Sequence, residues 1–189
     1  MKIGIVVVDG FSDIDFYLPW DLLNRVRILG LANNWTVEVL ANKTLHSATK
    51  LPLQPTQPYF HAKECDGVFF CSGNILKDLC NDPDFLSQFD LNPSKQYIAA
   101  VDSGTLILAA LGHLNDKDAT TYPTHFEKLK EMGTHPIKKS FVSEGRIATG
   151  ARCLSSDKLS FWLIESLLGP DAALKVYQSV KPLDLEDQF

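Results

Sequence analysis

The stretch Lys2-Ile3-Gly4-Ile5-Val6-Val7-Val8 is apolar throughout after its first residue, and Asp9-Gly10 follows it as a turn signal. A strand that is apolar on both faces is typical of a parallel sheet with helices on both sides, because neither face of such a sheet meets water. The stretch therefore predicts a buried strand of a parallel sheet, and the rest of the fold is built outward from it.

Three more runs read as strands, at residues 36–41, 67–71 and 97–101, and helical patterns separate them. The helices are predicted at residues 18–26, 75–79, 85–89, 105–111, 126–132, 159–168 and 172–180. Strands that alternate with helices form βαβ units. The predicted fold class is therefore α/β: a three-layer, flavodoxin-like sandwich around a mostly parallel central sheet.

Two segments leave alternatives open. Residues 43–59 contain Pro52, Pro55 and Pro58, so they form either a loop or a short edge hairpin. Residues 141–144 and 146–149 flank a Glu-Gly pair and form either a hairpin or two sequential strands. No break in composition divides the chain, so one domain is expected over residues 1–189, with residues 184–189 as an acidic tail that frays.

Charge and hydrophobicity exclude several classes of protein. The 189 residues contain 18 Lys and Arg against 23 Asp and Glu, a formal net charge of −5. A general nucleic-acid binder needs a basic face, so no nucleic-acid partner is expected. The apolar opening run ends at Asp9, far short of the ~20 residues that cross a bilayer. It also lacks a signal-peptide cleavage site, so neither a membrane partner nor secretion is expected.

The cysteines and histidines suggest no metal centre. The four cysteines form no CxxC pair, and a chain of this length without a secretory signal is expected to keep them reduced, in the cytoplasm. The five histidines lack the spacings that zinc sites use. We therefore assign neither a metal nor another cofactor.

The segment Val101-Asp102-Ser103-Gly104 joins a predicted strand to a predicted helix in the shortest possible space. Such a turn displays one side chain, here Asp102, above the sheet and beside the backbone N–H groups of the helix. Gly104 supplies the room that the turn needs. A plainer alternative is that Asp102 or Ser103 only caps the helix, since both residue types are preferred caps.

At this point the chain resembles a known family. The segment Gly10-Phe11-Ser12-Asp13-Ile14-Asp15, followed by Pro19, resembles the opening motif of the ThiJ/PfpI superfamily. The segment 100–112 resembles the elbow and helix of that superfamily, and segments 119–122 and 148–157 resemble later parts of its isonitrile hydratase and AraC-type branch. The resemblance implies the class I glutamine-amidotransferase-like fold and a homodimer.

Matched position by position, the resemblance implies site residues and one departure from the family. Asp15 matches the acidic residue of the family, and Ser103 matches the Ser or Thr that follows its nucleophile. Gly73 lies in the oxyanion-hole loop, where Cys71 and Ser72 replace the usual Pro-Gly. The nucleophilic cysteine is absent, because Asp102 occupies its place.

The segment 119–122 departs from the family as well. Tyr122 stands where a histidine is common, and His125 follows three residues later. Both residues remain candidates for ligand binding, and His125 or Tyr122 is the nearby candidate for a second base.

The implied geometry places two carboxyl groups, Asp15 and Asp102, in one site. We expect the helix N-terminus to lower the pKa of Asp102 and keep it ionised, with Asp15 as its protonated partner. The pair then hydrates or hydrolyses a small electrophile, with Asp102 as general base or nucleophile and Asp15 as acid. The amides of Gly73 and Ser103 are the expected oxyanion donors.

A non-enzymatic alternative stays open. An aspartate is close in shape and charge to an oxidised cysteine of the family's elbow, so the chain is alternatively a small-ligand-binding or stress-sensing homodimer without turnover. Cys71 and Cys153 fall near the elbow in the inferred fold, and either one is a displaced reactive thiol or an ordinary buried cysteine. In both alternatives the expected partner is a small molecule.

Overall fold

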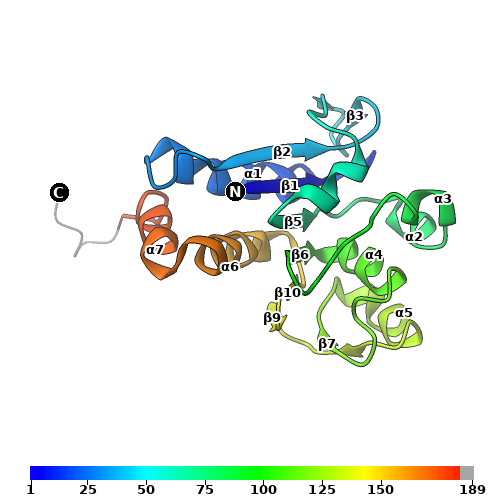
Figure 1. Cartoon of the computed structure of the whole chain (residues 1–189). Helices are drawn as coiled ribbons and strands as arrows, with labels where there is room; N and C mark the ends of the chain where they lie inside the picture. The colour runs from blue at the N-terminus through cyan, green and yellow to red at the C-terminus, as the bar shows by residue number, and fades with distance from the viewer. Residues whose placement is uncertain (184–189) are drawn as a thin grey trace.

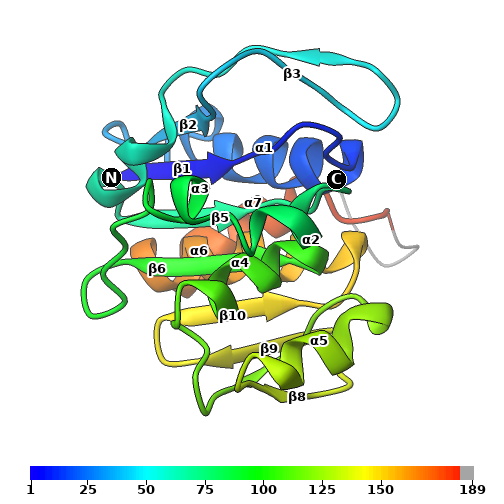
Figure 2. The same ribbon diagram turned by 90° about the vertical axis from the view of Figure 1, so that its right-hand side faces the viewer.

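The computed structural model describes residues 1–183, so the predicted fraying of residues 184–189 lies outside the described residues. A six-stranded sheet forms the middle layer, in the order β2-β1-β5-β6-β10-β9, as Figure 2 shows from top to bottom. The first five of these strands are parallel, and β9 is antiparallel to β10. Their bounds are β1 Lys2–Val6, β2 Thr36–Leu40, β5 Gly67–Phe70, β6 Tyr97–Val101, β9 Phe141–Glu144 and β10 Ile147–Gly150.

Helices cover both faces of this sheet, which confirms the predicted fold class. Helices α1, α6 and α7 pack together on one face, and α4 lies on the other (Figures 1 and 2). The bounds of the α-helices are α1 Asp13–Ile28, α2 Leu76–Leu79, α3 Pro83–Leu86, α4 Thr105–Ala110, α5 Phe126–Glu131, α6 Ser156–Leu168 and α7 Pro170–Gln178. The 3-10 helices are η1 Tyr59–Glu64, η2 Asp102–Gly104, η3 Pro123–His125 and η4 Cys153–Ser155.

The central strands carry the core because both of their faces are dry. Ile5 of β1, Phe69 of β5 and Ile98 of β6 are fully buried. Val6 pairs with Phe70 in the ladder between β1 and β5. The carboxyl ends of these strands therefore lie at one edge of the sheet, where ligands bind in open α/β sheets.

The first helix is longer than the sequence predicts. It begins at Asp13 rather than residue 18, so Pro19 lies inside the helix and not in its first turn. A proline cannot donate to the carbonyl four residues earlier, which here belongs to Asp15. The buried thiol of Cys71 donates to that carbonyl instead, at 3.2 Å. A partner from another element thus lets the helix continue through the proline.

Both open alternatives resolve as hairpins. Within residues 43–59, β3 (Leu45–His46) and β4 (Pro52–Leu53) pair antiparallel, away from the main sheet. At the other edge β9 and β10 form a hairpin, and β10 adds parallel to β6. A second small pair joins β7 (Asp118–Ala119) and β8 (His135–Pro136).

Helices α3, α6 and α7 also begin earlier than the sequence predicts, at Pro83, Ser156 and Pro170 instead of residues 85, 159 and 172. Helix α3 begins at Pro83 and ends at Leu86, whereas residues 85–89 were expected. Asp82 decides this start, because its side chain accepts hydrogen bonds from the backbone of Asp84 and Phe85. The proline at the first helical position fits the same start.

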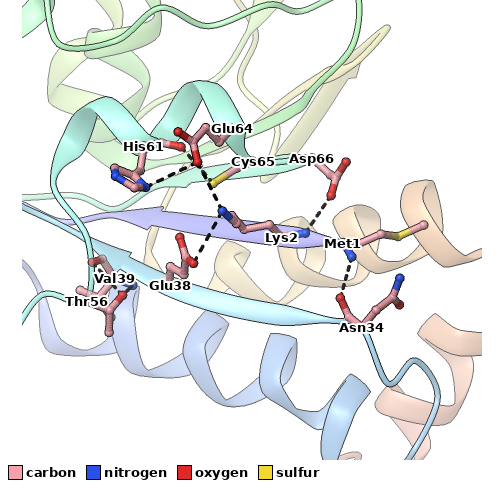
Figure 3. Close-up of polar contacts among 10 residues, drawn as sticks. All are labelled: Met1, Lys2, Asn34, Glu38, Val39, Thr56, His61, Glu64, Cys65 and Asp66. Atoms are coloured by element: carbon pink, nitrogen blue, oxygen red, sulfur yellow. Dashed lines mark hydrogen bonds and ion pairs between the residues drawn. The ribbon is translucent and has the colours of Figure 1, made fainter.

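The amino end of the central strands is closed by polar contacts (Figure 3). The Lys2 ammonium lies 3.5 Å from Glu64 and 4.0 Å from Glu38. The Lys2 amide donates to Asp66 at 2.8 Å. Half-exposed pairs of this kind stabilise a fold only weakly.

Within residues 1–183, no helix is long and apolar enough to cross a membrane.

Candidate active site

The turn after β6 holds Asp102 in an unusual backbone conformation. Its φ is +56°, in the left-handed region that non-glycine residues seldom adopt, at a cost of about 1–3 kcal/mol. The Thr121 hydroxyl donates to the Asp102 carbonyl at 2.8 Å and helps to hold the turn. The Asp102 carboxylate accepts from the adjacent Ser103 amide, at 2.6 Å, and caps neither η2 nor α4. The capping alternative is therefore not what the structure shows.

Gly104 is required where the turn meets the neighbouring strand. A Cβ atom at this position would lie 2.7 Å from the Phe70 carbonyl oxygen and 2.8 Å from that of Cys71. Both are backbone atoms at the end of β5, so neither can move aside easily. The glycine therefore lets α4 begin directly against the sheet, as expected from the sequence.

The turn at residues 101–104 is called the elbow. Asp15, in the first turn of α1, reaches this elbow. The residue is fully buried, and its Oδ2 atom accepts a short hydrogen bond from the Ser72 hydroxyl. The other oxygen, Oδ1, is buried and has no hydrogen-bond partner among residues 1–183. Asp15, Asp102 and Cys153 each place one oxygen or sulfur atom within 4.8 Å of the others. The two acids that the sequence singled out do lie in one site.

Burial raises the pKa of both acids. Desolvation raises the pKa of Asp15, although its hydrogen bonds oppose the shift. Desolvation and the neighbouring Asp15 raise the pKa of Asp102 to about 6, against the Ser103 amide and the Arg152 charge. The expectation that the helix N-terminus lowers the pKa of Asp102 is therefore wrong, because its loss of hydration outweighs the donors beside it.

Replacing Asp102 with Asn is expected to stabilise the fold at neutral pH. The raised pKa means that Asp102 favours folding only while it is protonated. Its contribution is full below the unfolded value near 3.8 and is lost as the pH rises through about 6. The shift of about two pK units corresponds to at most about 3 kcal/mol. Melting temperatures at pH 4 and pH 7.5 check this, and an equal gain at both would contradict it.

The two amides expected to bind an oxyanion already have acceptors. The Gly73 amide donates to the Ser103 hydroxyl oxygen at 3.2 Å, and the Ser103 amide donates to Asp102. The Ser103 hydroxyl also lies 3.4 Å from the Gly73 carbonyl oxygen, to which it donates. Ser103 thus ties the elbow to the loop after β5. Either amide must give up its present acceptor before it can hold an oxyanion.

A cavity of about 390 Å³ opens in front of Asp102. Of the residues singled out from the sequence, it is lined by Ser72, Gly73, Asp102, Ser103, Tyr122, His125 and Cys153. Asp15 and Gly104 are not among the lining residues. Sequence reasoning missed Lys77 and Thr124 as lining residues, and neither belongs to a motif that could have revealed it.

At neutral pH, His125 is a neutral imidazole and the two nearby cysteines are protonated thiols. Burial and Lys77 lower the pKa of His125, so its imidazole is neutral at pH 7. Cys71 is buried, and burial raises its pKa well above the usual value. Burial and Asp15 raise the pKa of Cys153 to about 11. Both cysteines therefore remain protonated thiols at neutral pH.

The cluster of Asp15, Asp102 and Cys153 is the group among residues 1–183 that could offer a metal ion three ligand atoms. One oxygen of each carboxyl already accepts a hydrogen bond from the protein. The thiol would also have to lose its proton before it could bind a metal. The three side chains of this cluster are therefore better suited to acid–base chemistry than to binding a metal ion.

The two acids lie at the carboxyl ends of parallel strands, next to a strained strand-to-helix turn. This arrangement defines a class of small-molecule site, but it does not identify one protein. Comparison with known proteins narrows the class. The profile of the DJ-1/PfpI family matches residues 1–166. The chain belongs to the DJ-1/PfpI family, as the sequence motifs predicted.

Relatives within this family differ in activity. The isonitrile hydratase of Pseudomonas putida is 25% identical over 190 residues, which cover 97% of this chain and 82% of that protein. The structure of Schizosaccharomyces pombe DJ-1 has a TM-score of 0.80 at 19% identity, and the match covers 97% of this chain and all of that one. An AraC family transcriptional regulator from Pseudomonas putida has a TM-score of 0.76 at 20% identity, covering 95% and 99%. These structural matches show the fold alone.

Proposed function

We propose that this chain hydrates a small electrophile, an isonitrile first of all, with Asp15 as general acid and Asp102 as general base. The observation that carries the proposal is the meeting of the two carboxyl groups within 4.8 Å beside a cavity of about 390 Å³. A similar protein, the isonitrile hydratase of Pseudomonas putida, supplies the substrate class. No sulfur nucleophile is needed, because proton transfers alone can carry the reaction.

The environment of each acid supports its role. Asp15 is the more deeply buried acid, and its Oδ1 atom has no donor among the described residues. A buried carboxylate oxygen without a donor is costly, whereas a protonated oxygen is not. Asp102 accepts a hydrogen bond from the Ser103 amide and is 9% exposed, so we assign the negative charge of the pair to it. Two neighbouring acids that hold their proton unequally form an acid–base pair.

Hydration of an isonitrile balances on this pair. Asp15 gives its proton to the terminal carbon of R–N≡C, and Asp102 takes a proton from water as the water oxygen bonds to that carbon. The product of this step is R–N=CH–OH. Asp102 then returns its proton to the nitrogen while Asp15 takes the hydroxyl proton, which releases the formamide R–NH–CHO. Both acids end in their starting states.

The occupied amides favour this reaction over amide or ester hydrolysis. Hydrolysis builds a negative oxygen that free backbone donors must stabilise. The amides of Gly73 and Ser103 both donate within the protein. Protonation of an isonitrile carbon builds no such oxyanion, so the site as it stands is suited to it.

The direct test offers the full chain an isonitrile, an amide and an aldehyde, and product formation is followed by NMR. We expect the formamide from the isonitrile and no comparable turnover of the other two. Binding of these compounds in the cavity without any turnover would contradict the proposal and favour the ligand-sensing alternative.

The pH dependence of turnover provides a second test. Activity should rise as the pH passes through about 6, because Asp102 must be ionised to accept a proton from water. Activity should fall again at higher pH, where the pair of acids loses the one proton that it shares. We expect a bell-shaped profile of kcat/KM that reports the pair rather than either residue alone. A profile that is flat between pH 5 and 7 would count against Asp102 as the base.

A further inference from the structure

A second cavity, of about 750 Å³, adjoins the cavity in front of Asp102, which we call the elbow cavity. The two share Thr124, so they are neighbours with a common wall. Lys138, Lys139 and Arg152 line the second cavity, and Glu127 is the acid among its lining residues. We call it the basic cavity. It gathers positive charge on a chain whose formal net charge is −5.

The described part of the chain forms no close ion pair with the cations that line the basic cavity. Within residues 1–183, no carboxylate lies within 4.0 Å of Lys138, Lys139 or Arg152. A fourth cation, Lys158, approaches from α6, and its ammonium lies 2.9 Å from the hydroxyl of Ser140, another lining residue. These exposed cations outnumber the one acid of the lining, Glu127, and give the cavity a positive potential that favours an anionic ligand.

The backbone that carries these cations is anchored. The Thr120 hydroxyl donates to the Lys139 carbonyl at 2.8 Å, and the Ala151 amide donates to the Ser140 carbonyl at 3.0 Å. Hydrogen bonds to the protein thus fix the segment before β9 and the segment after β10 relative to each other. The backbone at Lys139 and next to Arg152 is therefore held in place.

Arg152 connects the two cavities. Its guanidinium lies 5.5 Å from the ring centre of Tyr122, and that ring lines the elbow cavity. Its charge also acts on Asp102, whose pKa it lowers against the effect of burial. An anionic group beside Arg152 would therefore lie next to the site of the proposed chemistry.

We propose that the substrate of the elbow site carries an anionic group that the basic cavity holds. The inference rests on the proposed function and specifies its substrate class: an isonitrile joined by a short chain to a carboxylate. Because Asp102 repels an anion and Arg152 attracts one, the two charges also orient the molecule. Its electrophilic end enters the elbow cavity, and its carboxylate remains beside Arg152, Lys138 and Lys139.

The kinetic test compares ω-isocyano carboxylates of increasing chain length with the matching neutral primary amides. We expect the carboxylate to have at least about a tenfold higher kcat/KM at the best length, mainly through KM, with the preference shrinking at high salt. Arg152→Gln, and Lys138→Met with Lys139→Met, should remove most of the preference. Lys63→Met, on η1, should leave it unchanged. Equal kcat/KM for acid and amide at every length would overturn the proposal.

Replacing Glu127 is expected to change the preference for the carboxylate substrate in the opposite direction. Its carboxylate lines the basic cavity and opposes the binding of an anion. Glu127→Gln should therefore strengthen the carboxylate preference by a few-fold. A preference that responds neither to this variant nor to Arg152→Gln would show that the basic cavity is not used.

A binding experiment separates this proposal from the proposed function. N-formyl-β-alanine, a product analogue, and its neutral amide can be titrated into the chain by calorimetry, with no turnover required. Tighter binding of the acid that weakens in Arg152→Gln supports the anion site even if no isonitrile is hydrated. If the chain turns over isonitriles but binds the acid and the amide equally in every variant, this inference is refuted. The proposed function is then still supported.

Discussion

Replacing Asp102 with Asn is expected to lower isonitrile turnover by at least about 100-fold, the usual contribution of a positioned general base. Asn keeps the size of the side chain and can still accept from the Ser103 amide, so the elbow should stay folded. It cannot take a proton from water. Initial rates of formamide formation at pH 7.5 measure the loss, and a fully active variant would end the acid–base interpretation.

Further variants show whether the two acids act as one unit. Asp15→Asn should cause a similar loss, since it removes the proton that the isonitrile carbon receives. The double variant should be hardly worse than either single one, because groups that act together are not additive. Asp78→Asn, on the exposed side of α2, is the matched control and should keep full activity. Additive losses from the two acids would argue against a shared proton cycle.

Replacing Gly104 with Ala is expected to destabilise the fold by about 3 kcal/mol or more, the upper end of the cost of overpacking. The added Cβ would meet the carbonyl oxygens of Phe70 and Cys71, within 2.8 Å of both. To relieve the clash, α4 must move away from the end of β5. For a chain of this size the cost is a fall of roughly 6–12 °C in melting temperature.

Gly67→Ala provides the comparison for this effect. Its Cβ would lie 2.9 Å from the Ile3 Cδ1 atom, the far end of a flexible side chain that can turn aside. We therefore expect a smaller loss of stability at Gly67 than at Gly104. Thermal unfolding followed by circular dichroism measures both. Equal losses would show that the close backbone contact at Gly104 is not what limits substitution there.

The sequence was most informative where one physical signal dominates. Runs such as 2–8 and 67–71 are apolar on both faces, and only a covered parallel sheet accommodates them, so the fold class and central strands followed directly. Likewise, Asp102 and Gly104 sit in a turn too short to allow another geometry. In both cases the local sequence leaves the chain little choice.

The failures arose where distant residues decide the outcome. The start of α1 before Pro19 depends on Cys71, which satisfies the Asp15 carbonyl from another element. The pKa of Asp102 depends on how completely the surrounding chain excludes water, which no local motif reports. The acceptor that each amide chooses, as at Gly73, is a property of the folded loops. Tertiary contacts therefore determined what the motifs could not.

The carboxylate at the elbow changes what can damage this site. A cysteine thiolate is converted by peroxide to sulfenic and then to irreversible sulfinic and sulfonic acids. The carboxylate of Asp102 does not undergo this series of oxidations, and it is not a thiolate that alkylating agents could modify. The neighbouring Cys153 remains almost wholly protonated at neutral pH, so it offers oxidants little thiolate. The proposed acid–base chemistry therefore does not depend on a thiolate, the group that these oxidants modify.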